Sequence, residues 1–202
     1  MKALHADTPT LVTDSPLARF LFGDVRLAWL WLPLRLWVGW DWLTSGWGKL
    51  QNPDWITTGA ALKGFWERAI VVDPRPIILF DWYRDFLQLL LNVEAYTWFA
   101  KLITFGELAI GIALILGAFT GVAAFFGGFL NWNFLMAGSA SSNGLLFAIA
   151  TWLVLAWKTA GWIGLDRWLL RVLGTPWRPG YLFTRKPTED RRDDREITPR
   201  AA

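Results

Sequence analysis

Four ionisable side chains lie within stretches of the sequence that are otherwise strongly apolar. Arg35 and Asp41 lie in one such stretch, and Lys101 and Glu107 lie in a second. A charge at the centre of a membrane helix costs about 2.5–3.5 kcal/mol on insertion scales, so each of these groups needs a partner or a function. A buried carboxyl group can exchange a proton with a bound ligand, and Glu107 and Arg35 are therefore our candidate catalytic residues.

Depth in a membrane predicts how these charges pair. If the first stretch rises through the bilayer and the second descends, Arg35 and Glu107 both lie near the midplane. Asp41 and Lys101 then both lie in the outer third. We therefore expect the ion pairs Arg35–Glu107 and Asp41–Lys101. Two interpretations stay open: the pairs only hold two helices together, or Arg35 and Glu107 line a polar pocket, to which Thr104 on the same helix face adds a hydroxyl group.

A second polar stretch, Asn131–Asn143, has the sequence NWNFLMAGSASSN. The amides of Asn131 and Asn133 must be hydrogen-bonded if they lie inside an apolar helix. Helical spacing turns these two residues to nearly opposite faces. The two amides therefore cannot both face one pocket.

The Gly/Ser-rich turn that ends this stretch contains Ser139, Ser142 and Asn143. Ser142 or Asn143 is positioned to cap the following helix, and the free backbone N–H groups at a helix N-terminus attract anions. A natural anion-binding site is one interpretation of this turn. An ordinary tight turn between helices is the alternative interpretation.

The composition indicates a protein that lies in lipid. Of the 202 residues 54% are hydrophobic and 16 are Trp, and only three residues between Tyr96 and Ala160 are charged. This distribution excludes an ordinary cytosolic enzyme and a disordered chain. The chain has no cysteine, and its single histidine, His5, lies in a polar segment, so we expect no iron–sulfur cluster, haem or metal in this chain. Electrons that pass through it need a quinone, a bound organic cofactor or a partner.

Four segments approach the roughly 20 apolar residues that a membrane-spanning helix needs. They comprise residues 25–47, 97–116, 120–136 and 143–162. Unpaired backbone groups are costly in hydrocarbon, so each segment should be α-helical. Small residues spaced four apart, as at Ala109 and Ala113 or at Ala124 and Gly128, allow close helix packing. The predicted fold class is all-α, an integral membrane four-helix bundle.

The segment between the first two spans, residues 48–96, is long enough to carry structure of its own. The sequence Asp73-Pro-Arg-Pro76 divides it, because proline breaks helices. We expect one short helix at Thr57–Val72 and a second at Leu79–Val93. The second helix has charged residues beside an apolar face, so we place it on the membrane surface as part of a long extracytoplasmic loop that carries short interfacial helices. A fifth, tilted span is the alternative.

The numbers of Lys and Arg residues near the spans predict the orientation. The terminal segments, 1–24 and 163–202, hold 13 basic residues together with the flanking Arg26 and Lys158, whereas the 48–96 loop holds five. We therefore expect a multi-pass protein of the cell (inner) membrane with both termini in the cytoplasm. The mixed charges near the C-terminus are typical of a disordered tail. We expect this basic tail to lie next to anionic lipid and to bind no nucleic acid.

Four features of the sequence occur together. They are the Arg- and Asp-bearing first span that ends in Ser45-Gly-Trp-Gly-Lys49, the Phe105-Gly-Glu107 segment, the small-residue third span and the NWNFLMAGSASSN motif. With this combination the chain resembles the DoxX/DoxD family of small four-helix membrane proteins. The resemblance covers roughly residues 29–162.

The resemblance also implies a function. DoxD-like members are associated with thiosulfate:quinone oxidoreductase, and this chain is similar to its large subunit. We therefore expect a membrane subunit of a quinone-linked oxidoreductase that converts thiosulfate to tetrathionate with reduction of quinone, the activity of a thiosulfate dehydrogenase (quinone). Whether the chain is catalytic alone stays open.

In this interpretation the candidate residues take separate roles. The thiosulfate dianion would contact Lys49, Lys101, Ser139, Ser142 and Asn143. The quinone would contact Asn131, Thr104 and Trp42. Glu107 would deliver a proton to the quinone beside Arg35, and Asp41 would form a structural ion pair with Lys101.

The expected partners are membrane lipid, quinone and a second subunit or redox partner. The second subunit is expected to perform part of the chemistry, because the chain has no cysteine to mediate electron transfer from sulfur. Assembly into a homo-oligomer stays open. The main alternative is a non-catalytic subunit that anchors or docks a larger redox complex in the membrane. A transporter is less attractive, because the sequence has no detectable internal repeat.

Overall fold

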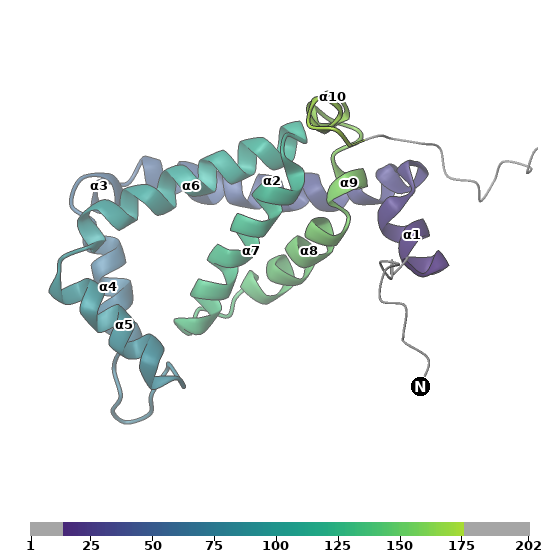
Figure 1. Ribbon diagram of the computed structural model, residues 1–202. Helices are drawn as coiled ribbons and strands as arrows, with labels where there is room; N and C mark the ends of the chain where they lie inside the picture. Colours follow the sequence, from purple (N-terminus) through teal and green to yellow (C-terminus); the bar gives the residue numbers. More distant parts are fainter. Residues whose placement is uncertain (1–13, 176–202) are drawn as a thin grey trace, which may run out of the picture.

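The computed structural model describes residues 14–175, and every regular element in this range is helical (Figure 1). In chain order the elements are α1 (Pro16–Gly23), η1 (Val25–Leu27), α2 (Ala28–Leu50), α3 (Pro53–Ile56), α4 (Ala60–Ala69), α5 (Asp81–Asn92), α6 (Tyr96–Leu116), α7 (Thr120–Met136), α8 (Asn143–Leu155), α9 (Trp157–Ala160) and α10 (Asp166–Val172). The predicted all-α class is therefore confirmed for the described residues. The predictions about His5 and the disordered C-terminal tail lie outside them.

The four long helices pack as two pairs, α2 with α6 and α7 with α8. Figure 1 shows α3, α4 and α5 gathered at one end of the α2/α6 pair, and α1, α9 and α10 at the other end. Contacts of α6 with α7 and of α2 with α8 join the two pairs. By length and composition, α6 is the one described helix that is long and apolar enough to cross a membrane, while α8 is apolar but shorter.

Two apolar cores hold these helices together. The larger core lies between the helix pairs and includes Trp31, Val38 and Leu153, all nearly inaccessible to solvent. The second core lies under α4 and α5, where Trp66 and Leu87 pack with residues of α6 and α7. The helices of the 48–96 loop are therefore part of the packed structure.

Several predicted boundaries differ from the observed ones. The first predicted span, 25–47, corresponds to α2, which begins at Ala28 and runs to Leu50; the loop helices are shorter than Thr57–Val72 and Leu79–Val93. The predicted span 143–162 is interrupted at Ala156, which separates α8 from α9. Within the predicted C-terminal segment 163–202, α10 is folded and buries Asp166 and Leu170 against the rest of the protein.

Backbone contacts at glycines set the register between α2 and α6. A Cβ atom added to Gly111 would lie 2.6 Å from the backbone nitrogen of Leu43, and one added to Gly46 would lie 2.9 Å from the backbone nitrogen of Leu108. Both distances are too short for a real Cβ atom, so only glycine permits this approach. Small residues at helix interfaces allow such contact, and here they place Glu107 next to Gly46.

Arg35 lies at the end of the α2/α6 pair that carries α9 and α10. Its side chain is buried, and its guanidinium donates to the carbonyl oxygens of Ala160 (3.1 Å) and Ile163 (2.8 Å). A side chain at Gly117, where α6 ends with a left-handed residue (φ 65°), would collide with this guanidinium. The predicted Arg35–Glu107 ion pair is therefore wrong, because the Arg35 guanidinium bonds to carbonyl groups beside α9 instead.

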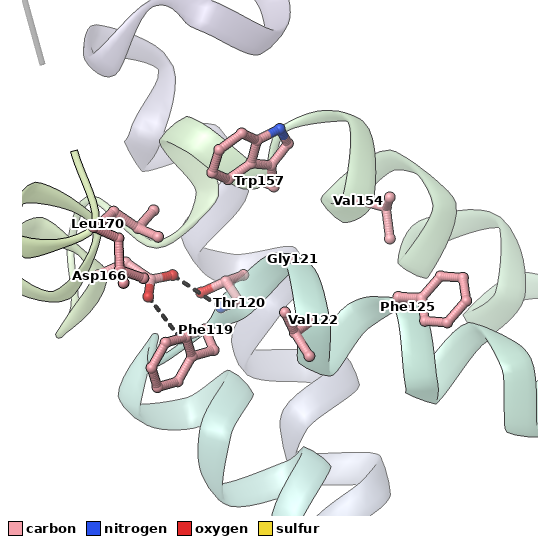
Figure 2. A pocket seen from close by; sticks show the side chains of 10 residues that line it. Phe119, Thr120, Gly121, Val122, Phe125, Val154, Trp157, Asp166 and Leu170 are labelled. Atoms are coloured by element: carbon pink, nitrogen blue, oxygen red, sulfur yellow. Dashed lines mark hydrogen bonds between the residues drawn. The ribbon is translucent and has the colours of Figure 1, made fainter. Parts of the chain in front are cut away.

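Asp166 closes the same end of the molecule. Figure 2 shows its carboxylate directed at the start of α7, where it accepts hydrogen bonds from the backbone N–H groups of Phe119 (2.6 Å) and Thr120 (2.9 Å). An anion at a helix N-terminus is favourable, because the first N–H groups of a helix have no partner within it. Beside this cap lies an apolar groove of about 390 Å³ between α7, α8 and α10.

The register of α2 and α6 generates a prediction about stability. We expect Gly111→Ala to destabilise the protein by about 1–3 kcal/mol, because the added methyl group meets the backbone of α2 and both helices must move apart. Gly106→Ala in the same helix is the control, since open space surrounds that position. Thermal unfolding of the purified variants in detergent measures both effects. A melting temperature for Gly111→Ala equal to that of Gly106→Ala would contradict this register.

Candidate functional site

A buried cluster of three polar side chains joins α2 to α6. The Lys49 ammonium group donates to both carboxylate oxygens of Glu107, at 2.9 and 2.7 Å, and to Ser45 Oγ at 2.7 Å. The Ser45 hydroxyl group in turn donates to Glu107 Oε2 at 3.0 Å. Glu107 is inaccessible to solvent, whereas 16% of the Lys49 side chain is exposed. The partner of the buried Glu107 carboxylate is thus Lys49.

The geometry of the cluster follows from its helices. Ser45 and Lys49 are four residues apart on α2, so they lie on one face, one turn apart. The glycine between them in the motif, Gly46, brings α6 close enough for both side chains to reach Glu107. Lys49 also lies 5.0 Å from the centroid of the Trp55 ring, a favourable position for a cation.

This cluster borders a cavity of about 460 Å³, which we call the polar cavity. Its lining comes from α2, α3, α4, α7, α8 and the α7–α8 turn. The lining residues are Asp41, Trp42, Ser45, Lys49, Trp55, Ala61, Phe65, Arg68, Asn131, Phe134, Ser139, Ser141, Ser142, Asn143 and Leu146. Six of the predicted ligand-binding residues therefore meet here: Trp42, Lys49, Asn131, Ser139, Ser142 and Asn143.

Two residues that line the cavity contain buried polar atoms without a hydrogen-bond partner in the structure. Asn131 is fully buried, and neither its amide nitrogen nor its amide oxygen is bonded. Trp42 is 3% exposed, and its indole N–H group is also without a partner. Leaving a buried donor or acceptor unsatisfied costs about 1–3 kcal/mol, so both residues hold unused hydrogen-bonding capacity at the edge of the cavity.

Asn133 faces away from the polar cavity, as the helical spacing predicts. Its amide oxygen and its backbone carbonyl oxygen lie 3.3 and 3.1 Å from the Tyr83 hydroxyl group, which donates to them. The Asn133 amide nitrogen donates to the carbonyl oxygen of Phe129 at 2.8 Å. Burial raises the pKa of Tyr83 to about 12, so its hydroxyl group remains protonated at neutral pH.

The α7–α8 turn supplies hydroxyl and amide groups to the cavity. Ser142 occupies the N-cap position of α8, but its side chain makes no capping hydrogen bond. The Asn143 amide nitrogen donates to the Ser139 carbonyl oxygen at 2.8 Å, which folds the turn back on itself. The expected capping interaction is thus absent, and the Ser142 hydroxyl group is not used to cap the helix.

Three of the predicted site residues lie elsewhere. Arg35 is at the opposite end of α2, and Thr104 donates to the carbonyl oxygen of Ala100 within α6. Lys101 is exposed on α6. Within residues 14–175 no ion pair joins it to Asp41, so the predicted Asp41–Lys101 pair is wrong. Asp41 instead lines the polar cavity, close enough to act electrostatically on Glu107.

For two residues of the site, Ser45 and Arg68, the sequence predicted no function. Ser45 bridges Lys49 and Glu107, and its spacing four residues before Lys49 is the signal that could have identified it. Arg68 reaches the cavity from α4, and nothing in the sequence relates it to α2. The positive charges of Lys49 and Arg68 balance the negative charges of Asp41 and Glu107. The site therefore carries no net formal charge, and in the described part of the chain no group of three or more His, Cys, Asp or Glu could hold a metal ion.

The buried pair generates a prediction about coupling. We expect Lys49→Met to destabilise the protein by about 3–5 kcal/mol, because it leaves the Glu107 carboxylate buried without a partner. The double variant Lys49→Met/Glu107→Leu should recover much of this loss, since no charge then remains buried. Thermal unfolding in detergent measures both.

Lys63→Met is the control for the same chemical change. Lys63 forms an exposed pair with Glu67 at 3.8 Å, and such pairs contribute about 0–1 kcal/mol. If the double variant were as unstable as the sum of the two single changes, Lys49 and Glu107 would not form a coupled pair.

Comparison with known proteins places the chain in a family. The DoxX family matches residues 30–138, more than half of the 202-residue chain. The match includes Ser45, Lys49, Glu107 and Asn131 and ends before Ser142, and it does not distinguish a DoxD-like branch. Searches of curated proteins and of solved structures found no match. The chain therefore belongs to the DoxX family of membrane-associated proteins.

Proposed function

We propose that this chain is the membrane subunit of a quinone-linked oxidoreductase and that the polar cavity binds the quinone ring. The observation that carries the proposal is the pair of unsatisfied polar groups, Asn131 and Trp42, in the wall of a cavity beside a buried Lys–Glu cluster. A cavity of about 460 Å³ is in the size range of small-molecule sites. The Glu107 carboxylate behind the wall neutralises Lys49, which favours a neutral ligand over an anion in the interior.

The unsatisfied groups match both redox states of a quinone. The carbonyl oxygens of the oxidised ring accept hydrogen bonds, which the Asn131 amide nitrogen and the Trp42 indole N–H group can donate. The hydroxyl groups of the reduced ring donate, and the Asn131 amide oxygen can accept. Binding would thus satisfy three atoms that have no partner in the protein alone.

Reduction of the ring needs two electrons and two protons. Lys49 and Ser45 line the cavity and can donate protons to the quinone oxygens, whereas Glu107 lies behind them and does not line it. We assign proton delivery to the Lys49 ammonium group, which is partly exposed and regains its proton from solvent after each transfer, with the Ser45 hydroxyl group as a relay; the Glu107 carboxylate holds Lys49 in place. Arg35 has no part in this scheme, because it lies at the other end of α2.

Thiosulfate is the electron donor that we propose. Two thiosulfate ions form the central S–S bond of tetrathionate and release two electrons, and one quinone takes up these electrons with two protons. The dianion would bind at the mouth of the cavity, where Arg68 is exposed near the hydroxyl groups of Ser139 and Ser142. The chain has no cysteine to carry electrons from sulfur, so the proposal includes a second subunit that does so.

The proposed arrangement in the membrane follows the sequence. α2, α6, α7 and the α8–α9 segment cross the membrane, both termini lie in the cytoplasm, and α3, α4 and α5 lie on the outer surface. The predominance of basic residues outside the 48–96 loop supports this orientation. The polar cavity then opens toward the outer side, where a soluble anion arrives. Assembly with a second copy is compatible with this arrangement.

A docking subunit without catalytic function is the second candidate. One observation favours it: the Glu107 carboxylate is fully buried, and Lys49 and Ser45 satisfy it within the protein. In that case the sole role of the cluster is to hold α2 against α6. The two candidates differ in whether the polar cavity binds a ligand.

Asn131→Leu tests the proposed quinone site. We expect it to weaken binding of a benzoquinone to the purified protein by about tenfold or more, because it removes the donor and the acceptor that we assign to the ligand. Gln88→Leu makes the same amide-to-leucine change on the exposed face of α5 and should leave binding unaltered. Calorimetric titration measures both affinities. Equal affinity in the Asn131→Leu variant and the parent protein would favour the docking function.

Arg68→Gln tests the proposed donor site. In membranes that contain the complete complex, thiosulfate-dependent quinone reduction should show a several-fold higher KM for thiosulfate, because an exposed cation at the mouth of the cavity is lost. Lys63→Gln on the same helix does not affect the cavity lining and serves as the control. A KM that responds equally to both substitutions would assign the effect to general surface charge and remove Arg68 from the donor site.

A further inference from the structure

A second cavity lies beside the polar cavity, between α4, α5, α6 and α7. It has a volume of about 130 Å³, and we call it the aromatic chamber. Its walls are apolar and rich in aromatic rings, among them Phe65, Trp66, Phe99 and Phe134. The polar groups at its edge, Tyr83 and Asn133, are bonded to each other. The chamber therefore offers no unsatisfied hydrogen-bonding group and suits an apolar occupant.

The aromatic chamber and the polar cavity share a wall. Phe65 and Phe134 line both spaces. Their rings pack edge to face, with centroids 6.2 Å apart and planes at 71°. The two side chains come from different helices, α4 and α7, so the boundary between the spaces is a contact of two rings and not a continuous backbone.

The chamber also reaches the outer surface of the helices. Phe86 on α5 and Phe129 on α7 line it and are 42% and 50% exposed. Exposed aromatic and aliphatic residues next to them, such as Leu89 and Phe126, form an apolar surface that lipid would cover. The chamber therefore lies between the lipid-facing surface and the polar cavity.

The size of the chamber limits what it can hold. An apolar cavity of about 150 Å³ in another protein binds one benzene molecule, so a volume of about 130 Å³ accommodates a ring or a short length of hydrocarbon chain. A molecule with a polar ring and an apolar chain would fill the two adjoining spaces with the matching parts. A quinone of the membrane is such a molecule.

We propose that the aromatic chamber binds the part of the quinone's hydrocarbon chain nearest the ring, while the ring occupies the polar cavity and the chain continues into lipid between α5 and α7. The Phe65–Phe134 pair frames the passage between the two spaces. This inference rests on the proposed function, because it requires a quinone in the polar cavity. It adds that the protein recognises the chain as well as the ring.

Two quinones with the same ring distinguish binding of the ring in the polar cavity from binding of the chain in the aromatic chamber. One carries a ten-carbon alkyl chain and the other carries none, and their affinities for the full-length protein in lipid nanodiscs are compared by calorimetric titration. Ala137→Leu fills the chamber, because Ala137 is buried in its wall. We expect it to weaken binding of the alkyl quinone by about tenfold, the effect of removing a few methylene groups from an apolar site, and to leave the ring-only quinone unaffected.

Further variants keep the test decisive. Leu90→Trp narrows the chamber at its half-buried α5 edge and should act in the same way if Ala137→Leu does not fold. Ala109→Leu makes the matching change on an exposed face of α6 and should alter neither affinity. Asn131→Leu should weaken both quinones, because both place a ring in the polar cavity.

Three results would overturn the inference. If the chamber variants weaken both quinones equally, or neither, while Asn131→Leu weakens both, the chain does not lie in the chamber and the proposed function stands. If the parent protein binds neither quinone, the proposed function fails and this inference fails with it. If mass spectrometry finds a phospholipid that stays bound at saturating alkyl quinone and is lost in Ala137→Leu, the chamber is a lipid site.

Discussion

The backbone contact between α2 and α6 is the constraint on which the rest of the structure depends. Gly111 lies against the backbone of Leu43, and Gly46 lies against Leu108, so the two helices cannot slide or separate without breaking these contacts. This approach places Glu107 within reach of Lys49, which removes an isolated charge from the apolar interior. Asp41, Ser45 and Lys49 are spaced four residues apart on one face of α2, and all three line the polar cavity.

The charges predicted to meet at the membrane midplane are divided between the two ends of the molecule. The expected depths in the membrane placed Arg35 of α2 beside Glu107 of α6. The glycine contacts instead place Gly46 beside Glu107, and Gly46 lies eleven residues after Arg35 in α2. At about 1.5 Å per residue this difference is roughly 16 Å. α3 and α4 contact α6, and Gly59, just before α4, lies against the backbone of Tyr96 at the start of α6. Packing of the loop helices could not be predicted from hydropathy.

Other parts of the site were predictable, because they depend on local spacing. The opposite directions of Asn131 and Asn133 follow from the helical period, and the two residues line different cavities. The Ser139–Asn143 turn and Trp42 were identified by residue type as ligand-binding groups, and they meet in one cavity. Arg68 and the role of Ser45 were not, since both depend on how α4 and α6 pack against α2. The carbonyl partners of Arg35 were not predicted either. The sequence analysis considered only charged side chains as partners, whereas Arg35 bonds to backbone carbonyl groups at the end of α9 and beyond it.

Photoaffinity labelling with an azido-quinone tests the central claim most directly, because it reports where the ring lies without any substitution. After illumination of the protein in nanodiscs and proteolysis, mass spectrometry identifies the labelled peptides. The account predicts label on the second half of α2 and on the Asn131–Asn143 segment, and its loss in excess unlabelled quinone. Label confined to the apolar groove beside Trp157 and Leu170, at the opposite end of the molecule, would contradict it.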